Sequence, residues 1–168
     1  MRNTALLLFI ALLGPARAIA ATSHSDFSGV WIMDAGRSES AHQEVPVTSS
    51  TLEIHLTGTE MTVETTRSEG GKDFHEKLNF RLDGSETTAT GDGGVAVTCK
   101  AHWDGPKLSV ETVRNIHDST VTTLYIHSLS ADGRIMTVDK TLTVQHGYQG
   151  QTGKNSGHGT DVFVRSPK

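Results

Sequence analysis

Nine histidines are the residues best suited to chemistry in this chain of 168 residues: His24, His42, His55, His75, His102, His117, His127, His146 and His158. Imidazole titrates near neutral pH and is the commonest ligand of transition metals. A metal site needs several such groups to converge, yet no two histidines share His-x-His or His-x-x-x-His spacing, and His-Glu-x-x-His is absent. The spacing therefore predicts no metal site and no cofactor. It favours histidines scattered over the solvent side of the protein.

Four polar residues alternate with apolar side chains in short runs, namely His55, His102, Tyr125 and His127. If the apolar side of each run forms the core, as Leu124 and Ile126 would, these four residues face water, and we favour this interpretation. If the polar side instead lines a cavity, they could converge with nearby carboxylates as general acids and bases. An enzyme or metal-binding barrel is therefore an alternative. It requires two histidines, or a histidine and a carboxylate, within hydrogen-bonding reach inside the cavity.

A glycine-rich run spans residues 146–159. It does not match a phosphate-binding loop, because its Gly-Lys pair is followed by Asn155 rather than Ser or Thr, and because a strand rather than a helix follows. We expect a mobile hairpin loop at the rim or lid of a barrel mouth. His146, Tyr148 and His158 are the residues of this rim loop that could meet a ligand.

Short runs of Val, Ile, Leu and Thr that alternate with polar residues dominate the chain after Ser23 and are broken by Asp-Gly pairs. This alternation predicts strands, and Asp-Gly pairs predict tight hairpin turns because they accept a positive φ. We count about nine or ten strands of ordinary length. Residues 35–44 could hold a helical turn or two, or a loop. Strands without crossover helices predict an all-β antiparallel meander, either a closed barrel or two packed sheets.

The first twenty residues have the features of a secretory signal peptide. Arg2 is followed by nine apolar residues, a Gly-Pro pair and two Ala-x-Ala tripeptides. Nine residues fall well short of the roughly 20 that span a bilayer, so no membrane anchor is expected. We expect cleavage after Ala18 or Ala20 and a single domain, residues 21–168, that is exported to the periplasm or outside the cell.

Charge and cysteine content exclude several classes of protein. The formal charge of −4 becomes −6 for residues 21–168, because the leader carries two arginines and no acidic residue. A negative chain with 5% aromatic residues lacks the basic surface and stacking platforms of nucleic-acid binders. One cysteine, Cys99, excludes an intrachain disulfide and a multi-thiolate metal site. It lies between Val97 and Ala101 on an apolar face, which predicts a buried, inert thiol.

The motif Gly-x-Trp ending at Trp31, together with Arg165 at the end of the last apolar run, resembles the lipocalin (calycin) signature. The resemblance implies that Trp31 plugs one end of a barrel and that Arg165 packs across its ring, a cation–π contact of ~0.5–2 kcal/mol. Longer stretches resemble a group of exported bacterial lipocalin-like proteins without an established function: Phe27–Trp31, Leu82–Glu86, Ala101–Gly105, Leu129–Gly133 and Val162–Arg165. This resemblance implies a lipocalin-like barrel of about 8–10 strands and an exported address, and it supplies no catalytic residue.

We therefore expect an up-and-down β-barrel that binds a small, partly apolar molecule and is not an enzyme, because barrels of this size have room for about one small ligand. Two alternatives stay open. One is the enzyme or metal-binding barrel described above. The other is a protein-interaction module whose interior is filled by side chains.

Overall fold

The computed structural model describes residues 24–147 and 153–167, and these residues form one sheet of ten antiparallel strands. The strands are β1 (Gly29–Met33), β2 (Val47–Leu56), β3 (Glu60–Glu69), β4 (Lys72–Arg81), β5 (Thr87–Thr90), β6 (Ala96–Asp104), β7 (Lys107–Ile116), β8 (Ser119–Leu129), β9 (Ile135–His146) and β10 (Lys154–Arg165). Three short 3₁₀ turns accompany them: η1 (Ala35–Arg37), η2 (Glu39–His42) and η3 (Asp92–Gly94). Within the described residues, no helix has the length and hydropathy needed to cross a membrane.

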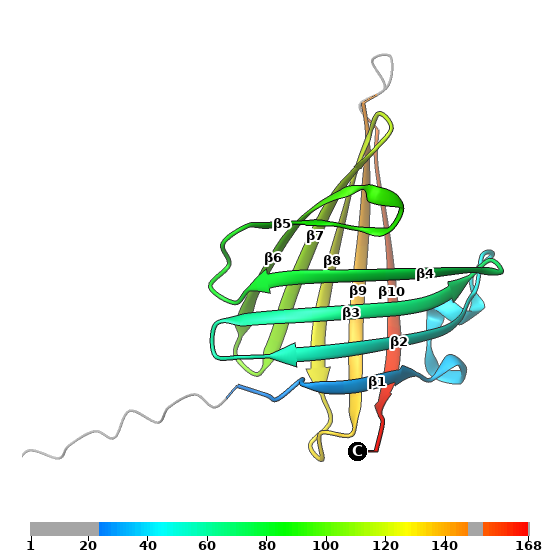
Figure 1. Ribbon diagram of the computed structural model, residues 1–168. Helices are drawn as coiled ribbons and strands as arrows, with labels where there is room; N and C mark the ends of the chain where they lie inside the picture. Colours follow the sequence, from blue (N-terminus) through cyan, green and yellow to red (C-terminus); the bar gives the residue numbers. More distant parts are fainter. Residues whose placement is uncertain (1–23, 148–152, 168) are drawn as a thin grey trace, which may run out of the picture.

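The sheet closes on itself almost completely. Its strand order is β4-β3-β2-β1-β10-β9-β8-β7-β6-β5, and Figure 1 shows β1–β4 crossing in front of β6–β10. The two ends of the sheet meet where Thr87 Oγ1 donates a hydrogen bond to the carbonyl of Asn79 at 2.6 Å, and where Asp83 forms a bridge with His102. The predicted all-β, up-and-down barrel of about 8–10 strands is therefore confirmed.

Two of the Asp-Gly pairs form the hairpin turns that the sequence predicts. Gly105 joins β6 to β7 with φ +57°, and Gly133 joins β8 to β9 with φ +67°. A residue with a Cβ is strained at such angles, which is why glycine stands there. Residues 35–44 form η1 and η2, two short 3₁₀ turns, rather than a regular helix.

One end of the barrel is packed with apolar side chains. The buried residues of this core are Phe27, Trp31, Met33, Ile54, Met61, Leu78, Phe80, Leu82, Val97, Cys99, Ala101, Leu108, Val110, Met136, Val138 and Phe163. Cys99 has no exposed surface, and burial raises the pKa of its thiol to about 11, so the predicted buried thiol is confirmed. We call this end of the molecule the closed end.

The prediction of which face of β8 points into the barrel is wrong. Tyr125 and His127 point into the barrel, while Leu124 and Ile126 lie on the outer face. The reason is register: His127 pairs with Leu108 and Tyr125 with Val110, and directly opposed residues of antiparallel strands share a face. Both faces of β8 carry apolar side chains, so alternation within this strand alone does not identify the buried one.

The glycine-rich run is less of a loop than expected. β10 begins at Lys154 and pairs with β9 from that residue on, so the second half of the run is strand. Glycines weaken a strand without preventing backbone pairing, and β9 supplies a complete partner. Tyr148 lies outside the described residues.

Candidate functional site

The closed end is held by Trp31 and Arg165, which the structure places against each other. The Cζ atom of Arg165 lies 4.2 Å from the centroid of the Trp31 ring. Trp31 is fully buried, and its Nε1 donates a hydrogen bond to the carbonyl of Phe27 at 2.8 Å. Arg165 Nε donates to the carbonyl of Gly133 at 2.8 Å, Nη2 donates to that of Asp26 at 2.8 Å, and Nη1 donates to that of Ser28.

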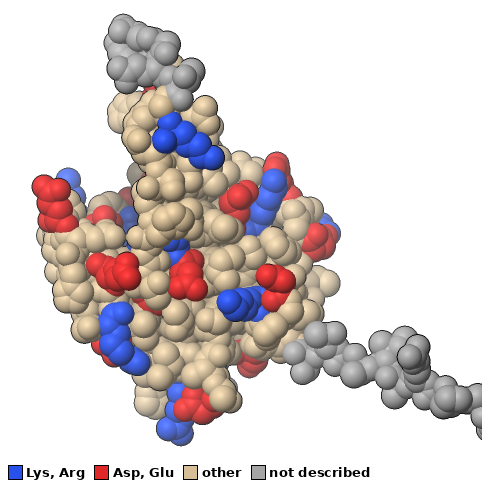
Figure 2. Space-filling view, turned by 180° about the vertical axis from the view of Figure 1, so that it is seen from behind, with Lys and Arg blue, Asp and Glu red and all other residues tan. Residues whose placement is uncertain are grey.

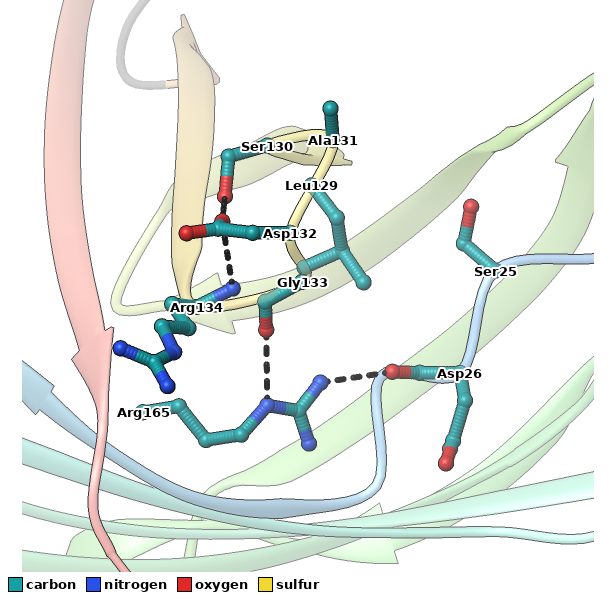
Figure 3. A pocket seen from close by; sticks show the side chains of 9 residues that line it. All are labelled: Ser25, Asp26, Leu129, Ser130, Ala131, Asp132, Gly133, Arg134 and Arg165. Carbon is teal, nitrogen blue, oxygen red and sulfur yellow. Dashed lines mark hydrogen bonds between the residues drawn. The ribbon is translucent and has the colours of Figure 1, made fainter.

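An open depression lies beside this pair at the closed end (Figure 3). Its lining consists of Ser25, Asp26, Leu129, Ser130, Ala131, Asp132, Gly133, Arg134 and Arg165. Each of the three guanidinium nitrogens of Arg165 already donates to a backbone carbonyl, so this residue ties the N-terminal segment and the β8–β9 turn to the end of β10. The arrangement suits the architecture of the barrel better than the binding of a ligand.

The interior changes character away from the closed end. Side chains two residues apart on a strand share a face, so the inner face continues from the core into a set of partly exposed residues. We call seven of these the polar belt: Thr65, Arg67, Glu76, Arg114, Tyr125, Lys140 and Asp161. The barrel is thus filled with apolar groups at one end, and its inner wall is polar and reached by solvent toward the other.

An ion pair of the polar belt spans the place where the sheet ends meet. Arg114 Nη2 on β7 lies 2.8 and 2.7 Å from the two carboxylate oxygens of Glu76 on β4. The backbone N–H of Asp92, in η3 after β5, donates to the same carboxylate at 3.3 Å. Arg114 Nη1 donates to Thr112 Oγ1 at 2.9 Å. Both ionic side chains are mostly buried, which makes this contact stronger than a surface ion pair.

Two further cations of the belt also have anionic partners. Arg67 Nε donates to Glu69 Oε2 at 2.9 Å, and its guanidinium lies 4.7 Å from the centroid of the Phe74 ring. Lys140 Nζ lies 3.4 Å from Asp161 Oδ2. Each positive charge of the belt is therefore offset by a neighbouring carboxylate. Nη1 and Nη2 of Arg67 have no hydrogen-bond partner among the described residues, so they stay available as donors.

The hydroxyl of Ser40 connects η2 to this belt. Lys140 Nζ donates to Ser40 Oγ at 2.7 Å, and Ser40 Oγ donates to Asp161 Oδ2 at 2.6 Å. The backbone N–H of Ser40 donates to the other oxygen of that carboxylate at 3.0 Å. The segment between β1 and β2 is thereby fastened to β9 and β10.

Tyr125 lies on the inner face of β8, near enough to Arg114, Arg67 and Glu76 for their charges to act on its phenol. Burial raises the pKa of its phenol above the ordinary value, and this effect outweighs the opposing influences of Arg114, of a hydrogen bond with the side chain of Thr123 and of Arg67. The phenol is therefore neutral at physiological pH and can donate a hydrogen bond. The structure thus brings Tyr125 together with two arginines that we did not predict as site residues.

The histidines are dispersed. His55 and His102 are exposed on the outer face, whereas His127 is buried and its Nδ1 lies 3.3 Å from the carbonyl of Leu108. Because a carbonyl only accepts, Nδ1 carries the proton. His146 and His158 lie on β9 and β10 near the projecting end of the sheet, where they contact Ser119 and Thr141 respectively.

The alternative of an enzyme requires two histidines, or a histidine and a carboxylate, within hydrogen-bonding reach inside the barrel. Residues 24–147 and 153–167 contain no such pair on the inner face. The one close histidine–carboxylate pair among them, His75 Nε2 and Glu64 Oε1 at 3.3 Å, lies on the outer face. The described residues also contain no group of three or more His, Cys, Asp or Glu side chains placed to hold a metal ion.

The charged members of the polar belt were not among the predicted site residues: Arg67, Glu76, Arg114, Lys140 and Asp161. The signal was present in the alternation itself. Each of them lies an even number of residues from a buried apolar residue of its own strand, as Glu76 does from Leu78. Following each apolar face along its strand, two residues at a time, for one or two further positions would have placed these charges inside the barrel.

Comparison with known proteins supports the fold. No protein-family model matches the chain, and no curated protein matches it. Among solved structures, the REP1-NXSQ fatty acid transporter is 15% identical with a TM-score of 0.50, covering 84% of this chain and 96% of that one. A secretary abundant heat soluble (SAHS) protein from Ramazzottius varieornatus is also 15% identical with a TM-score of 0.50, covering 86% and 98%. At these identities the likeness concerns the fold, a calycin-like β-barrel.

Proposed function

We propose that this protein is an exported barrel that binds a small, partly apolar molecule in its interior without catalysing a reaction. The observation that carries the proposal is the graded inner wall. Buried apolar side chains form its floor, and the partly exposed polar belt lies above them. Binding sites for small molecules commonly combine an apolar lining with a few convergent polar groups.

The geometry suggests how such a molecule would lie. Its apolar part would point toward the core, beside Val63 and Leu52, which are half-buried on the inner face. A hydrogen-bond acceptor at its other end would meet the neutral phenol of Tyr125 and the Nη atoms of Arg67, which have no partner within the described part of the chain. Since every cation of the belt has a carboxylate beside it, this end of the molecule need not be charged.

Substituting a tryptophan for an inward-facing residue of the polar belt tests the proposal. Thr65 faces inward and is half-buried, whereas Thr66, the next residue, is exposed on the outer face. We expect Thr65→Trp to weaken binding of anilinonaphthalene sulfonate by about tenfold or more, because the new side chain occupies the space of the ligand. Thr66→Trp is the matched control and should leave the affinity within about twofold. Fluorescence titration measures both.

Equal loss in the two variants would indicate binding to the outer surface and would contradict the proposal. A second readout uses a natural ligand. The chain, purified from a bacterial periplasm without refolding, is compared by mass spectrometry under native and denaturing conditions. A reproducible extra mass under native conditions that is absent from Thr65→Trp supports a ligand in the barrel.

The exported address is tested by the mass of the same sample. Removal of the leader predicts an intact mass that corresponds to a chain beginning at Ile19 or Ala21. Substitution of Ala18 and Ala20 together by bulky residues should block cleavage, because signal peptidase requires small residues there. A full-length chain recovered from the cytoplasm would overturn this part of the proposal.

A further inference from the structure

β10 has a long stretch of backbone without a neighbour on one side. β9 pairs with it from Lys154 to Val164, whereas β1 pairs only with Phe163–Arg165. Below this stretch the edge is covered, since the N–H of Asp34 donates to the carbonyl of Val162 at 2.8 Å. Between Lys154 and Thr160, the described residues provide no strand on the outer edge of β10 (Figure 1).

The hydrogen bonds at its two ends show which backbone groups of β10 face outward. The N–H of His146 donates to the carbonyl of Gly153 on the β9 side, while the carbonyl of Val162 accepts from Asp34 on the opposite side. Backbone groups of successive residues in an antiparallel strand point to opposite neighbours. The even-numbered residues Lys154, Ser156, His158 and Thr160 therefore point their N–H and C=O groups away from β9, and these groups have no partner among residues 24–147 and 153–167.

This edge lacks the features that normally protect an edge strand. Such strands are usually short, charged, bulged or interrupted by proline. The segment Lys154–Thr160 contains no proline and one charge, that of Lys154, and residues 154–158 are exposed. Figure 2 shows the projecting top of the molecule as mostly uncharged surface with one basic patch. An open, flat edge of this kind is a template for another strand.

We propose that Lys154–Thr160 pairs in antiparallel fashion with the same segment of a second copy of this chain, about a two-fold axis at Gly157. Because this axis is perpendicular to the sheet, the outer faces of the two sheets lie on the same side. Each even-numbered residue then lies opposite an even-numbered residue of the second copy. Lys154 then faces Thr160 of the second copy and Ser156 faces His158, each pair occurring twice. The four outward-facing residues of one copy meet those of the other, which satisfies the backbone groups of the edge.

The side chains around the segment complement this arrangement on both faces. On the outer face, Lys154 of one copy lies in line with Thr160 and Asp139 of the other, since Thr160 pairs with Asp139 and donates a hydrogen bond to it at 2.9 Å. Strands two apart are separated by about 10 Å, which the side chains of a lysine and an aspartate can bridge. Neither Lys154 nor Asp139 has an ion-pair partner within the described residues of its own chain.

On the inner face, Asn155 of one copy opposes Gly159 of the other. Glu39 Oε2 lies 3.3 Å from the position that a Cβ on Gly159 would occupy, so a carboxylate oxygen stands beside the incoming amide. The absence of a side chain on Gly157 and Gly159 leaves room for this approach. These contacts favour a second copy over an unrelated strand as the occupant of the edge.

Proline at the edge tests the pairing directly. Ser156→Pro removes an outward N–H and leaves the ladder with β9 intact, because that N–H does not face β9. We expect the wild-type chain to dimerise reversibly in sedimentation equilibrium between about 1 μM and about 1 mM, and Ser156→Pro to stay monomeric. Ser156→Ala keeps the N–H and is the control that should dimerise like the wild type. Circular dichroism verifies that all three are folded.

Charge reversal tests the register independently. Lys154→Glu and Asp139→Lys should each raise the dimer dissociation constant about fivefold, because the symmetric interface contains the pair twice. The double variant should recover most of the loss. A wild-type chain that is monomeric over the whole range, or dimerisation of Ser156→Pro equal to that of Ser156→Ala, would overturn the proposal. This interface is separate from the interior, so either proposal can fail without the other.

Discussion

Replacing Trp31 by alanine is expected to lower the free energy of unfolding by about 3–5 kcal/mol. The side chain is fully buried, its indole N–H donates to the carbonyl of Phe27, and the guanidinium of Arg165 lies over its ring. Truncation therefore removes a large apolar contact, a hydrogen bond and a cation–π contact at once. Urea denaturation followed by circular dichroism measures the loss.

Ile32→Ala provides the matched control. Ile32 is the next residue of β1 but is 50% exposed, so its truncation should change stability by about 0.5 kcal/mol. Arg165→Ala is expected to lower stability as well, and the double variant should lose less than the sum of the single variants, because both residues belong to one network. If Trp31→Ala and Arg165→Ala both melt like the wild type, the assignment of this pair to the closed end is wrong.

Acidification is expected to lower the free energy of unfolding through His127 alone by about 3 kcal/mol. Burial lowers the pKa of this imidazole from its ordinary value of 6.5 to about 4, and the hydrogen bond with the Leu108 carbonyl opposes this effect only in part. In the unfolded chain the imidazole takes up a proton near pH 6.5, whereas in the folded chain it resists protonation until about pH 4. Above pH 6.5 the imidazole is neutral in both states and does not lower the free energy of unfolding. As the pH falls from 6.5 to 4, the unfolded chain binds a proton that the folded chain does not, and the free energy of unfolding decreases.

His127→Asn isolates this contribution. The amide nitrogen of asparagine can take the place of Nδ1 toward Leu108, but it does not titrate in this range. The variant should show a shallower fall of stability between pH 6.5 and 4, with the difference from the wild type approaching the value above. His55→Asn, the same substitution at an exposed position of the outer face, is the control. Parallel slopes for wild type and His127→Asn would show that the imidazole is not held in its neutral form by burial.

These two residues matter for the proposed function because both are buried in the floor of the barrel. Trp31 closes the end opposite the polar belt. His127 lies between the core and Tyr125, and the ring centroids of His127 and Tyr125 are 6.3 Å apart. A floor that stays packed keeps the polar belt in place above it. Loss of either residue should therefore reduce binding of the fluorescent probe in proportion to the loss of folded protein.

Much of the architecture was predictable from local pattern. Alternation of apolar and polar residues identified strands of the right kind and number, and Asp-Gly pairs marked hairpin turns such as those at Gly105 and Gly133. Both signals act between near neighbours: side chains alternate across a strand, and glycine accepts a positive φ wherever it stands. The contact between Trp31 and Arg165 followed from a resemblance rather than from pattern.

The amino-acid sequence by itself determined that this chain builds an antiparallel meander with one predominantly apolar face, because those properties depend on residues adjacent along the chain. Only the tertiary structure decided which face of β8 turns inward and which charges meet inside. Register with β7 turned Tyr125 and His127 inward, and closure of the sheet brought Glu76 to Arg114, 38 residues away. Such contacts depend on the pairing of distant strands, and no local pattern carries that information.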